Sequence, residues 1–324
     1  MRPGERGAAL LTVLMLVSVM AVLSATALER LRLSTRLAAN AGAIDQARAY
    51  AMAAEGIALG RITTLVEADP ARTPLAGGWN GAPQTLPLPG GQAVAVVRDG
   101  GNCFNLNSVV AGQVGQPLAA RQQGIDQLLT LARTLGIADG EARAVADALT
   151  DWIDSDQVPR PGGAEDARYA AEEVPYRTGG TLLADVSELR AIAGVTPELY
   201  ERLRPWVCAL PAADMSPTNV NTLAVGQAPL LAMLLPASVT VERARALIAA
   251  RPPGGWESAY AFSQMAADQG VLVGEAGSQL GVRTRWFSLA LEVRLGDSDV
   301  VETVLIDAGT PPARLVRRSW GEPL

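Results

Sequence analysis

The sequence predicts an α+β fold, in which a long N-terminal helix packs on a small antiparallel sheet and a large helical domain is inserted between the strands. Three observations lead to this prediction. Residues 8–41 contain no Gly or Pro, apolar strand patterns occur only near residues 91–99 and 287–307, and helical periodicity fills the interval between them. Hydrophobic residues make up 49% of the 324 residues, which is ample for a folded core.

The basic residues restrict the chemistry of the chain. Histidine is absent, and all 27 basic residues are arginine. Without His or Lys the chain cannot form a Ser-His-Asp triad, an HExxH zinc site, a P-loop or a Schiff base. The net charge of −6 weighs against binding to nucleic acid phosphates, which requires a basic face. We therefore expect a protein that is not an enzyme and does not bind nucleic acid.

The N-terminal segment predicts a membrane anchor. Between Arg6 and Glu29 lie 22 uncharged positions, and a helix of this length extends roughly 33 Å, enough to cross a bilayer core. A cleavable secretory signal is the alternative, because Arg2 precedes the apolar run and Ala25-Thr26-Ala27 offers a cleavage site. The length of the run and the absence of a helix breaker favour the anchor.

The helix is expected to continue well beyond the membrane. Apolar and small residues recur at spacings of three, four and seven and form one weakly apolar stripe, which consists of Leu33, Leu37, Ile44, Ala47, Ala51, Ala54 and Ala58. Arginines lie on both sides of the span, so the positive-inside rule does not settle the membrane orientation.

The first residues resemble the leader of a type IV pilin-like prepilin. A short charged segment ends at Arg6-Gly7 and is followed directly by Ala8 and the apolar run. The resemblance implies that prepilin peptidase cleaves after Gly7 and methylates the new amino group of Ala8. Most pilins and pseudopilins carry Glu at the fifth mature position, where this chain has Thr12. A subunit without this costly buried carboxylate resembles the K minor pseudopilins of type II secretion.

The residues after the long helix predict a loop and then strands. Residues 67–92 are rich in Pro and Gly, which is typical of a loop. The segment GQAVAVVRD then predicts a strand, and FSLALEVRL and VVETVLID predict a hairpin whose turn lies at Gly296–Asp299.

The interval from Phe104 to about Leu280 predicts a helical domain with an internal repeat. Asn105-Leu106-Asn107-Ser108 and Asn219-Val220-Asn221-Thr222 each precede a run of short helices, as Asn and Ser/Thr at caps and turns would. We therefore expect six parts: a leader (1–7), a transmembrane segment (8–29), the pseudopilin helix with the first strands (30–102), two inserted modules (103–214 and 215–280) and the C-terminal strands (281–324).

The two modules resemble helix-hairpin-helix or SAM-like units, some of which bind DNA. Their candidate hairpins at residues 193–196 and 236–239 lack the two-glycine turn that exposes backbone N–H groups to phosphate, and Lys is missing. We therefore expect these helices to serve as packing units.

An acidic segment is a candidate cation site. Between Asp147 and Glu173 the sequence has eight acidic residues and two arginines, and a Pro- and Gly-rich loop interrupts them. Carboxylates in an irregular loop suit Ca²⁺, although the EF-hand spacing is absent. A solvated acidic loop is the alternative. The segment resembles the stretch that carries calcium in the K pseudopilin family, which implies ligands among Asp151, Asp154, Asp156, Glu165 and Asp166.

Two cysteines, Cys103 and Cys208, border the first module. A disulfide between them is permitted if this part of the chain is periplasmic, and two separate buried thiols are the alternative. A catalytic thiol would require a histidine to activate it.

The order of these motifs along nearly the whole chain resembles the K pseudopilin family. The resemblance implies a type IV pilin-like core, a single-pass inner-membrane protein whose bulk is periplasmic, and a role at the tip of the periplasmic pseudopilus. The implied partners are the minor pseudopilins I and J, prepilin peptidase, and exoprotein substrates or the secretin. A periplasmic helix-hairpin-helix DNA-binding protein and a calcium-dependent secreted hydrolase remain as alternatives.

Overall fold

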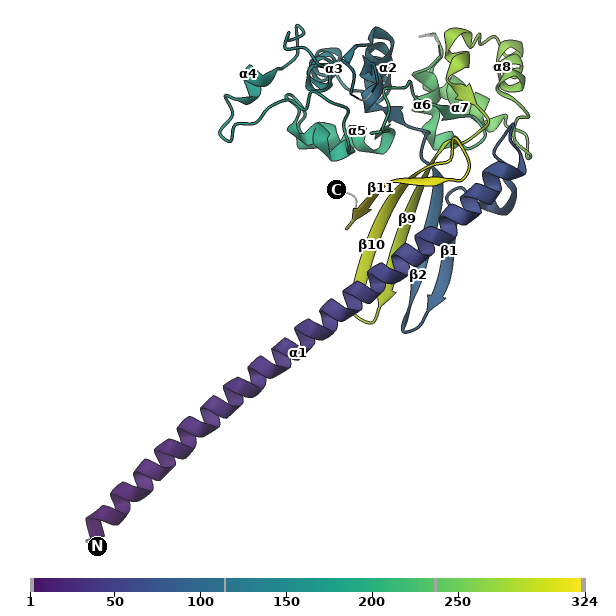
Figure 1. Ribbon diagram of the computed structural model, residues 1–324. Helices are drawn as coiled ribbons and strands as arrows, with labels where there is room; N and C mark the ends of the chain where they lie inside the picture. Colours follow the sequence, from purple (N-terminus) through teal and green to yellow (C-terminus); the bar gives the residue numbers. More distant parts are fainter. Residues whose placement is uncertain (1–2, 114, 236–237, 322–324) are drawn as a thin grey trace.

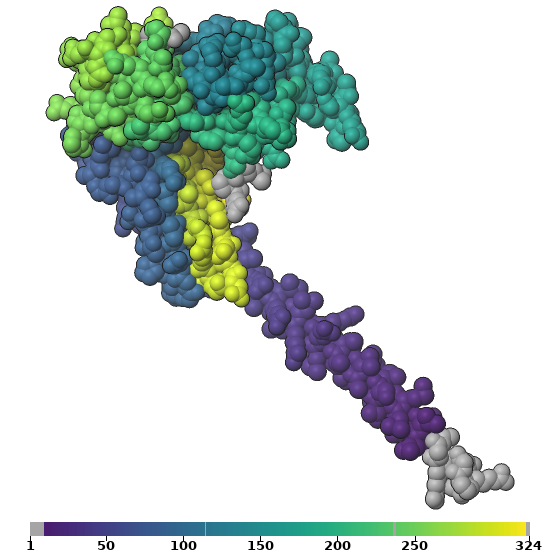
Figure 2. Space-filling view, turned by 180° about the vertical axis from the view of Figure 1, so that it is seen from behind, coloured from purple at the N-terminus to yellow at the C-terminus, as the bar shows by residue number. Residues whose placement is uncertain are grey.

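The computed structural model describes residues 3–113, 115–235 and 238–321, with side chains from residue 10 onward. Helix α1 (Pro3–Ala68) runs the length of the molecule, and its N-terminal half stands clear of the rest. A sheet lies against its C-terminal half, and a helical domain forms a broad head at the end farthest from the N-terminus (Figures 1 and 2). The predicted continuous helix and inserted helical domain are confirmed.

The two halves of α1 meet different surroundings. The large apolar side chains from Leu10 to Leu37 are all exposed. From Ala47 onward the predicted stripe is buried, and Ala51 and Ala54 pack with Ile62 against the sheet. Small residues at this spacing let the sheet approach the helix backbone closely. The part of the stripe before Ala47 is therefore exposed, and the part from Ala47 onward packs within the chain.

The sheet has five antiparallel strands in the order β1-β2-β9-β10-β11. Its bounds are β1 (Pro83–Leu88), β2 (Gly91–Asp99), β9 (Trp286–Leu295), β10 (Ser298–Asp307) and β11 (Arg314–Trp320). Alternate residues of β9, including Phe287, Leu289 and Leu291, are buried under α1. Because β2 pairs with β9, the whole of residues 100–285 is an insertion between two neighbouring strands.

The loop prediction for residues 67–92 is wrong over residues 83–88, which form strand β1. Pro83 and Pro87 suggested a loop because proline cannot donate to a strand ladder. β1 lies at the edge of the sheet, where one side of the strand needs no partner and proline is tolerated. The hairpin turn is also shorter than predicted, since Ser298 already pairs with Leu295 and only Gly296 and Asp297 lie between the strands.

The head contains seven α-helices among the described residues, all of them short. They are α2 (Gln122–Thr134), α3 (Asp139–Ile153), α4 (Asp166–Tyr169), α5 (Pro197–Leu203), α6 (Ala228–Ala232), α7 (Val241–Ala249) and α8 (Ala259–Asp268). Helices α4 and α8 were not predicted from the sequence. One continuous apolar core extends from Phe104 to Val282, so the two halves of the head form a single packed body.

Short two-residue strands close both halves of the head. They are β3 (Phe104–Asn105), β4 (Val110–Ala111), β5 (Ala119–Ala120), β6 (Val207–Cys208), β7 (Thr218–Asn219) and β8 (Leu280–Gly281). The strands β3 and β6 pair in parallel, as do β7 and β8. Short 3₁₀-helices connect the elements at Ala76–Gly78, Leu106–Val109, Val186–Ala191, Arg204–Trp206, Val225–Gln227 and Gly274–Ser278.

The predicted asparagine repeat has the same role in both halves. Asn105 accepts a hydrogen bond from the backbone N–H of Asn107 at 3.3 Å, and Asn219 accepts one from Asn221 at 2.9 Å. All four side chains are buried. In each half the first asparagine ends one strand of a parallel pair, so the local structure around the Asn-x-Asn segment is repeated. Residues 236–237 of the second predicted hairpin lie outside the described residues.

Candidate functional site

The acidic segment begins where helix α3 ends. Asp154 is the residue that caps the C-terminus of α3, and its backbone turns into an extended conformation there. The loop then returns toward the same point, so that Asp156 and Glu165 join Asp154. Ligand oxygens of these three carboxylates all lie within 4.8 Å of one another. The partial negative charge at the end of α3 adds to this concentration of negative charge.

The carboxylates are buried without enough partners. Asp154 and Glu165 are each only 5% exposed. One oxygen of Asp154 and both oxygens of Glu165 have no hydrogen-bond donor among the described residues. Burial, and next the neighbouring carboxylates, raise the pKa of Asp154 to about 6 and the pKa of Glu165 to about 7. Buried acceptors of this kind fit a hard divalent cation, which prefers carboxylate oxygens.

The other two predicted ligands have protein partners. Asp151 is buried on α3 and accepts a hydrogen bond from the backbone N–H of Arg160 at 3.1 Å. Asp166 accepts from the backbone N–H of Thr178 at 2.9 Å and from its hydroxyl at 3.0 Å. The structure therefore brings three of the five predicted carboxylates together, while Asp151 and Asp166 fix the two sides of the loop.

A further acidic residue, Asp147, was not among the predicted ligands. It lies one turn before Asp151 on α3 and accepts hydrogen bonds from the Arg160 guanidinium at 2.9 Å and from the backbone N–H of Gly162 at 3.1 Å. Its i, i+4 spacing from Asp151 is the sequence signal that both carboxylates face the same loop. Together they hold the Pro- and Gly-rich segment that carries the chain to Glu165.

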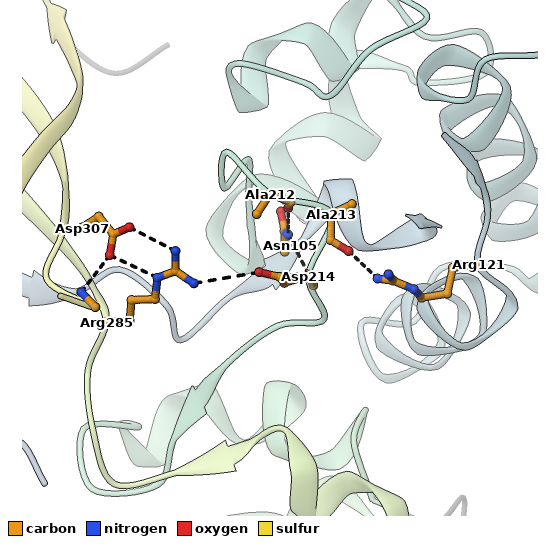
Figure 3. A network of polar contacts seen from close by, with 8 residues as sticks. Asn105, Arg121, Ala212, Ala213, Asp214, Arg285 and Asp307 are labelled. Atoms are coloured by element: carbon orange, nitrogen blue, oxygen red, sulfur yellow. Dashed lines mark hydrogen bonds and ion pairs between the residues drawn. The ribbon is translucent and has the colours of Figure 1, made fainter. Parts of the chain in front are cut away.

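A second polar centre joins the head to the sheet. Cys103 and Cys208 form a disulfide with a Cα–Cα distance of 5.8 Å. Beside it, the amide of Asn105 donates to the carbonyls of Ala212 and Asp214, both at 2.9 Å (Figure 3). These contacts fix the end of the first half of the head against its beginning.

An arginine immediately before β9, Arg285, extends this centre to the sheet. Figure 3 shows the Arg285 guanidinium between two carboxylates, with Asp307 at 3.1 Å and Asp214 at 3.9 Å. On the other side of the same segment, Arg121 of the head donates to the Ala213 carbonyl. The segment around residues 212–214 is thus held from both the sheet and the head.

The predicted processing residues lie near the N-terminus of α1. Gly7 and Ala8 belong to the helix, and the structure describes side chains only from Leu10 onward. The helix that follows has a stretch with a mean hydropathy of 2.3, none of which is buried within the chain. A helix of this length and composition can cross a membrane, and its complete exposure distinguishes it from the core helix of a soluble protein.

An exposed membrane-length helix, a sheet on its second half and a large domain inserted between two strands together define a membrane-anchored, pilin-like subunit. Family models described as type II secretion system (T2SS), protein K match residues 102–212 and 218–283. The chain belongs to this family of type II secretion system K proteins. It is therefore a minor pseudopilin.

Full-length relatives agree with the family assignment. The chain is 34% identical to the type II secretion system protein K of Pectobacterium carotovorum subsp. carotovorum, and the match covers 99% of this chain and 98% of the relative. It is 36% identical to the protein K of Klebsiella pneumoniae, with 98% and 97% covered.

A solved structure is also similar. The structure is described as the GspK-GspI-GspJ complex from the type 2 secretion system of enterotoxigenic Escherichia coli. The matched chain has a TM-score of 0.73 and 32% identity, and the match covers 86% of this chain and 96% of that chain. These similarities favour the pseudopilin over the DNA-binding and hydrolase alternatives.

Proposed function

We propose that this protein caps the tip of the periplasmic pseudopilus and helps to initiate its assembly. The observation that carries the proposal is the position of the head. It covers the end of the molecule farthest from the N-terminus, beyond the sheet and the C-terminal end of α1 (Figure 2). In a filament whose core is made of α1 helices, neighbours can pack alongside the exposed lower half of α1 but would collide with the head above.

The insertion offers a direct test of this role. The backbone N–H of Gly100 donates to the carbonyl of Trp286 at 2.8 Å, so the two ends of the insertion are adjacent. Residues 101–285 can therefore be replaced by a short Gly-Ser linker without separating β2 from β9. Gold-labelled full-length protein is expected only at filament ends, whereas the headless variant enters the shaft. Labelled full-length protein along the shaft would contradict the proposal.

The partners follow from the solved relative. That relative is part of a complex with GspI and GspJ, and we propose that this chain binds the minor pseudopilins I and J of its own system. Prepilin peptidase would cleave between Gly7 and Ala8. The bulk of the chain would lie in the periplasm, where the tip of the pseudopilus can meet exoprotein or the secretin. N-terminal sequencing of the mature protein tests the cleavage, with methylated Ala8 as the expected first residue. Assembly then requires no catalysis by this chain.

We further propose that Asp154, Asp156 and Glu165 hold a structural Ca²⁺ ion. Their unpartnered, buried oxygens support it, and Asp156 is exposed and can leave room for water ligands. The bound cation would compensate the mutual repulsion of the carboxylates and join the end of α3 to the start of α4. Calorimetric titration of the chelated full chain with Ca²⁺ tests this role, and Glu165→Gln is expected to abolish the binding. Unchanged binding by that variant would contradict the proposed ligand set.

A further inference from the structure

A cleft lies between the two halves of the head, on a side that none of the described elements covers. Its volume is about 510 Å³. One wall is formed by α2, with Asp126, Gln127 and Thr130, and the other by the segments around Leu234, Glu275 and Gln279. Helices α2 and α6 lie next to each other in the part of the molecule farthest from the N-terminus of α1 (Figure 1). The cleft is therefore remote from the surface along which α1 packs.

Two buried amides in this cleft lack partners. Gln127 and Gln279 are each only 8% exposed. Among the described residues, the side-chain oxygen of Gln127 and both the oxygen and the nitrogen of Gln279 have no hydrogen-bond partner. Native proteins leave few buried polar groups unpaired, because desolvating such a group without a partner is costly. Two such groups in one cleft mark it as a place where a ligand could supply partners that the described residues do not.

Both amides are held on rigid backbone. Gln127 lies in the middle of α2. Gln279 directly precedes β8, where its backbone N–H donates to the Ala276 carbonyl at 2.9 Å and its carbonyl accepts from the Thr218 N–H at 2.8 Å. The backbone of each residue is thus fully used within the fold, while its side-chain amide is left without a full set of partners and must turn toward the cleft to meet a ligand. Because the backbone is already ordered, only these side chains lose freedom when a ligand binds.

The chemistry of the cleft selects the kind of ligand. A primary amide presents a donor and an acceptor side by side, which matches the N–H and C=O groups of an extended peptide. Asp126 and Glu275 are exposed at the two walls. Asp126 accepts a hydrogen bond from the Gln122 amide at 2.9 Å, and neither carboxylate forms an ion pair with any described residue. The residues that line the cleft include no arginine, so an anionic ligand is disfavoured.

We propose that this cleft binds an extended segment of another polypeptide that carries a lysine or arginine side chain. The amides of Gln127 and Gln279 pair with its backbone, and Asp126 and Glu275 receive the basic side chain. Leu234 and Val273, which are largely buried, line the cleft where the aliphatic part of that side chain would lie. The segment belongs to a chain that reaches the head from outside, since the cleft lies away from α1.

The proposal is tested with two blocked, fluorescein-labelled hexapeptides, one alternating lysine with valine and the other alternating glutamate with valine. Anisotropy is measured with the full chain in lipid nanodiscs. The lysine peptide is expected to bind saturably and the glutamate peptide is not. Gln127→Leu and Gln279→Leu are each expected to weaken binding at least tenfold, whereas Gln264→Leu, which removes an exposed amide from α8, leaves binding unchanged.

Melting temperatures separate this proposal from a purely structural role. If the amides await an external ligand, Gln127→Leu and Gln279→Leu keep or raise the melting temperature, because each removes an unpaired buried group. A clear fall in melting temperature with both variants would show that the amides support the fold. Saturable binding that is unaffected by both variants, or no saturable binding of the lysine peptide, would show a cleft filled by water only. Each of these three results overturns the proposal.

Discussion

The disulfide between Cys103 and Cys208 permits a quantitative prediction. The two cysteines are 105 residues apart in sequence, so the bond closes nearly the whole first half of the head into a loop. In the chain-entropy treatment, a loop of this length lowers the entropy of the unfolded chain by roughly 16 cal/mol/K, or about 4.7 kcal/mol at 25 °C. The double variant Cys103→Ser, Cys208→Ser is expected to lose a free energy of unfolding close to this value.

The folded state should change little in this variant. The strands β3 and β6 still pair in parallel next to the disulfide, and Asn105 retains its hydrogen bonds to Ala212 and Asp214. The loss in free energy of unfolding therefore arises from the greater entropy of the unfolded chain. With a slope of about 3 kcal/mol per molar urea, the unfolding midpoint should fall by roughly 1.5 M.

The assay is urea unfolding of the full chain in detergent, followed by tryptophan fluorescence and circular dichroism. Reduction of the natural protein should produce the same loss, and the double variant should not respond to reductant. A loss smaller than about 1 kcal/mol would refute the reasoning, because it would mean that the unfolded chain gains little freedom when the bond is absent. So would a variant whose midpoint changed further on addition of reductant.

Three other perturbations have defined outcomes. Saturating Ca²⁺ at a hundred times its dissociation constant should stabilise the chain by about 2.7 kcal/mol relative to chelated protein; in thermal unfolding, Glu165→Gln should remove this difference and Glu173→Gln, which alters an exposed carboxylate outside the cluster, should retain it. Burial, and next the contact with Glu55 of α1, raise the pKa of Glu302 on β10, against the opposing effect of Arg318. Because the pKa of Glu302 is raised in the folded state, its contribution to the free energy of unfolding is complete below the ordinary value of 4.5 and is lost as the pH rises through the raised pKa. Urea unfolding at about pH 5 and about pH 8 should show this loss of stability. An equal loss in Glu302→Gln would contradict the assignment to Glu302. Asn107→Leu removes two hydrogen bonds to the carbonyls of Leu183 and Leu210 and one from the Leu183 N–H, so it should cost about 3 kcal/mol in urea unfolding, whereas Asn40→Leu on the exposed part of α1 should cost almost nothing.

Elements with strong periodicity could be predicted from the sequence. The uninterrupted helix and the hairpin of β9 and β10 follow from apolar patterns that extend over many residues. Strand β1 could not be predicted, because its prolines are compatible with a strand only at a sheet edge and the sequence does not show which strand forms the edge. Three arginines among the seven residues of β11 obscured its pattern in the same way.

The candidate site was predicted at the level of the segment rather than the atoms. The composition around α3 indicated a cation, but sequence spacing does not show that the loop returns Glu165 to Asp154. Asp166 is adjacent to Glu165 and chemically equivalent as a ligand, yet its carboxylate is directed to Thr178. Such a distinction depends on side-chain direction in an irregular loop, which no sequence period describes. The unpaired amides of Gln127 and Gln279 are likewise visible only when both walls of their cleft are in place.

The prolines of β1 have a consequence for polymerisation. A filament subunit that exposes an open sheet edge risks joining its neighbours strand to strand, in an uncontrolled and irreversible manner. Pro83 and Pro87 remove N–H donors from one edge of this sheet. At the other edge, the charge of Arg314 and the register shift of β11 opposite Leu305 and Ile306 both hinder pairing with a further strand. Growth by sheet addition is thus discouraged on both flanks, which leaves contacts made by α1 as the route by which related subunits join this one in an ordered filament.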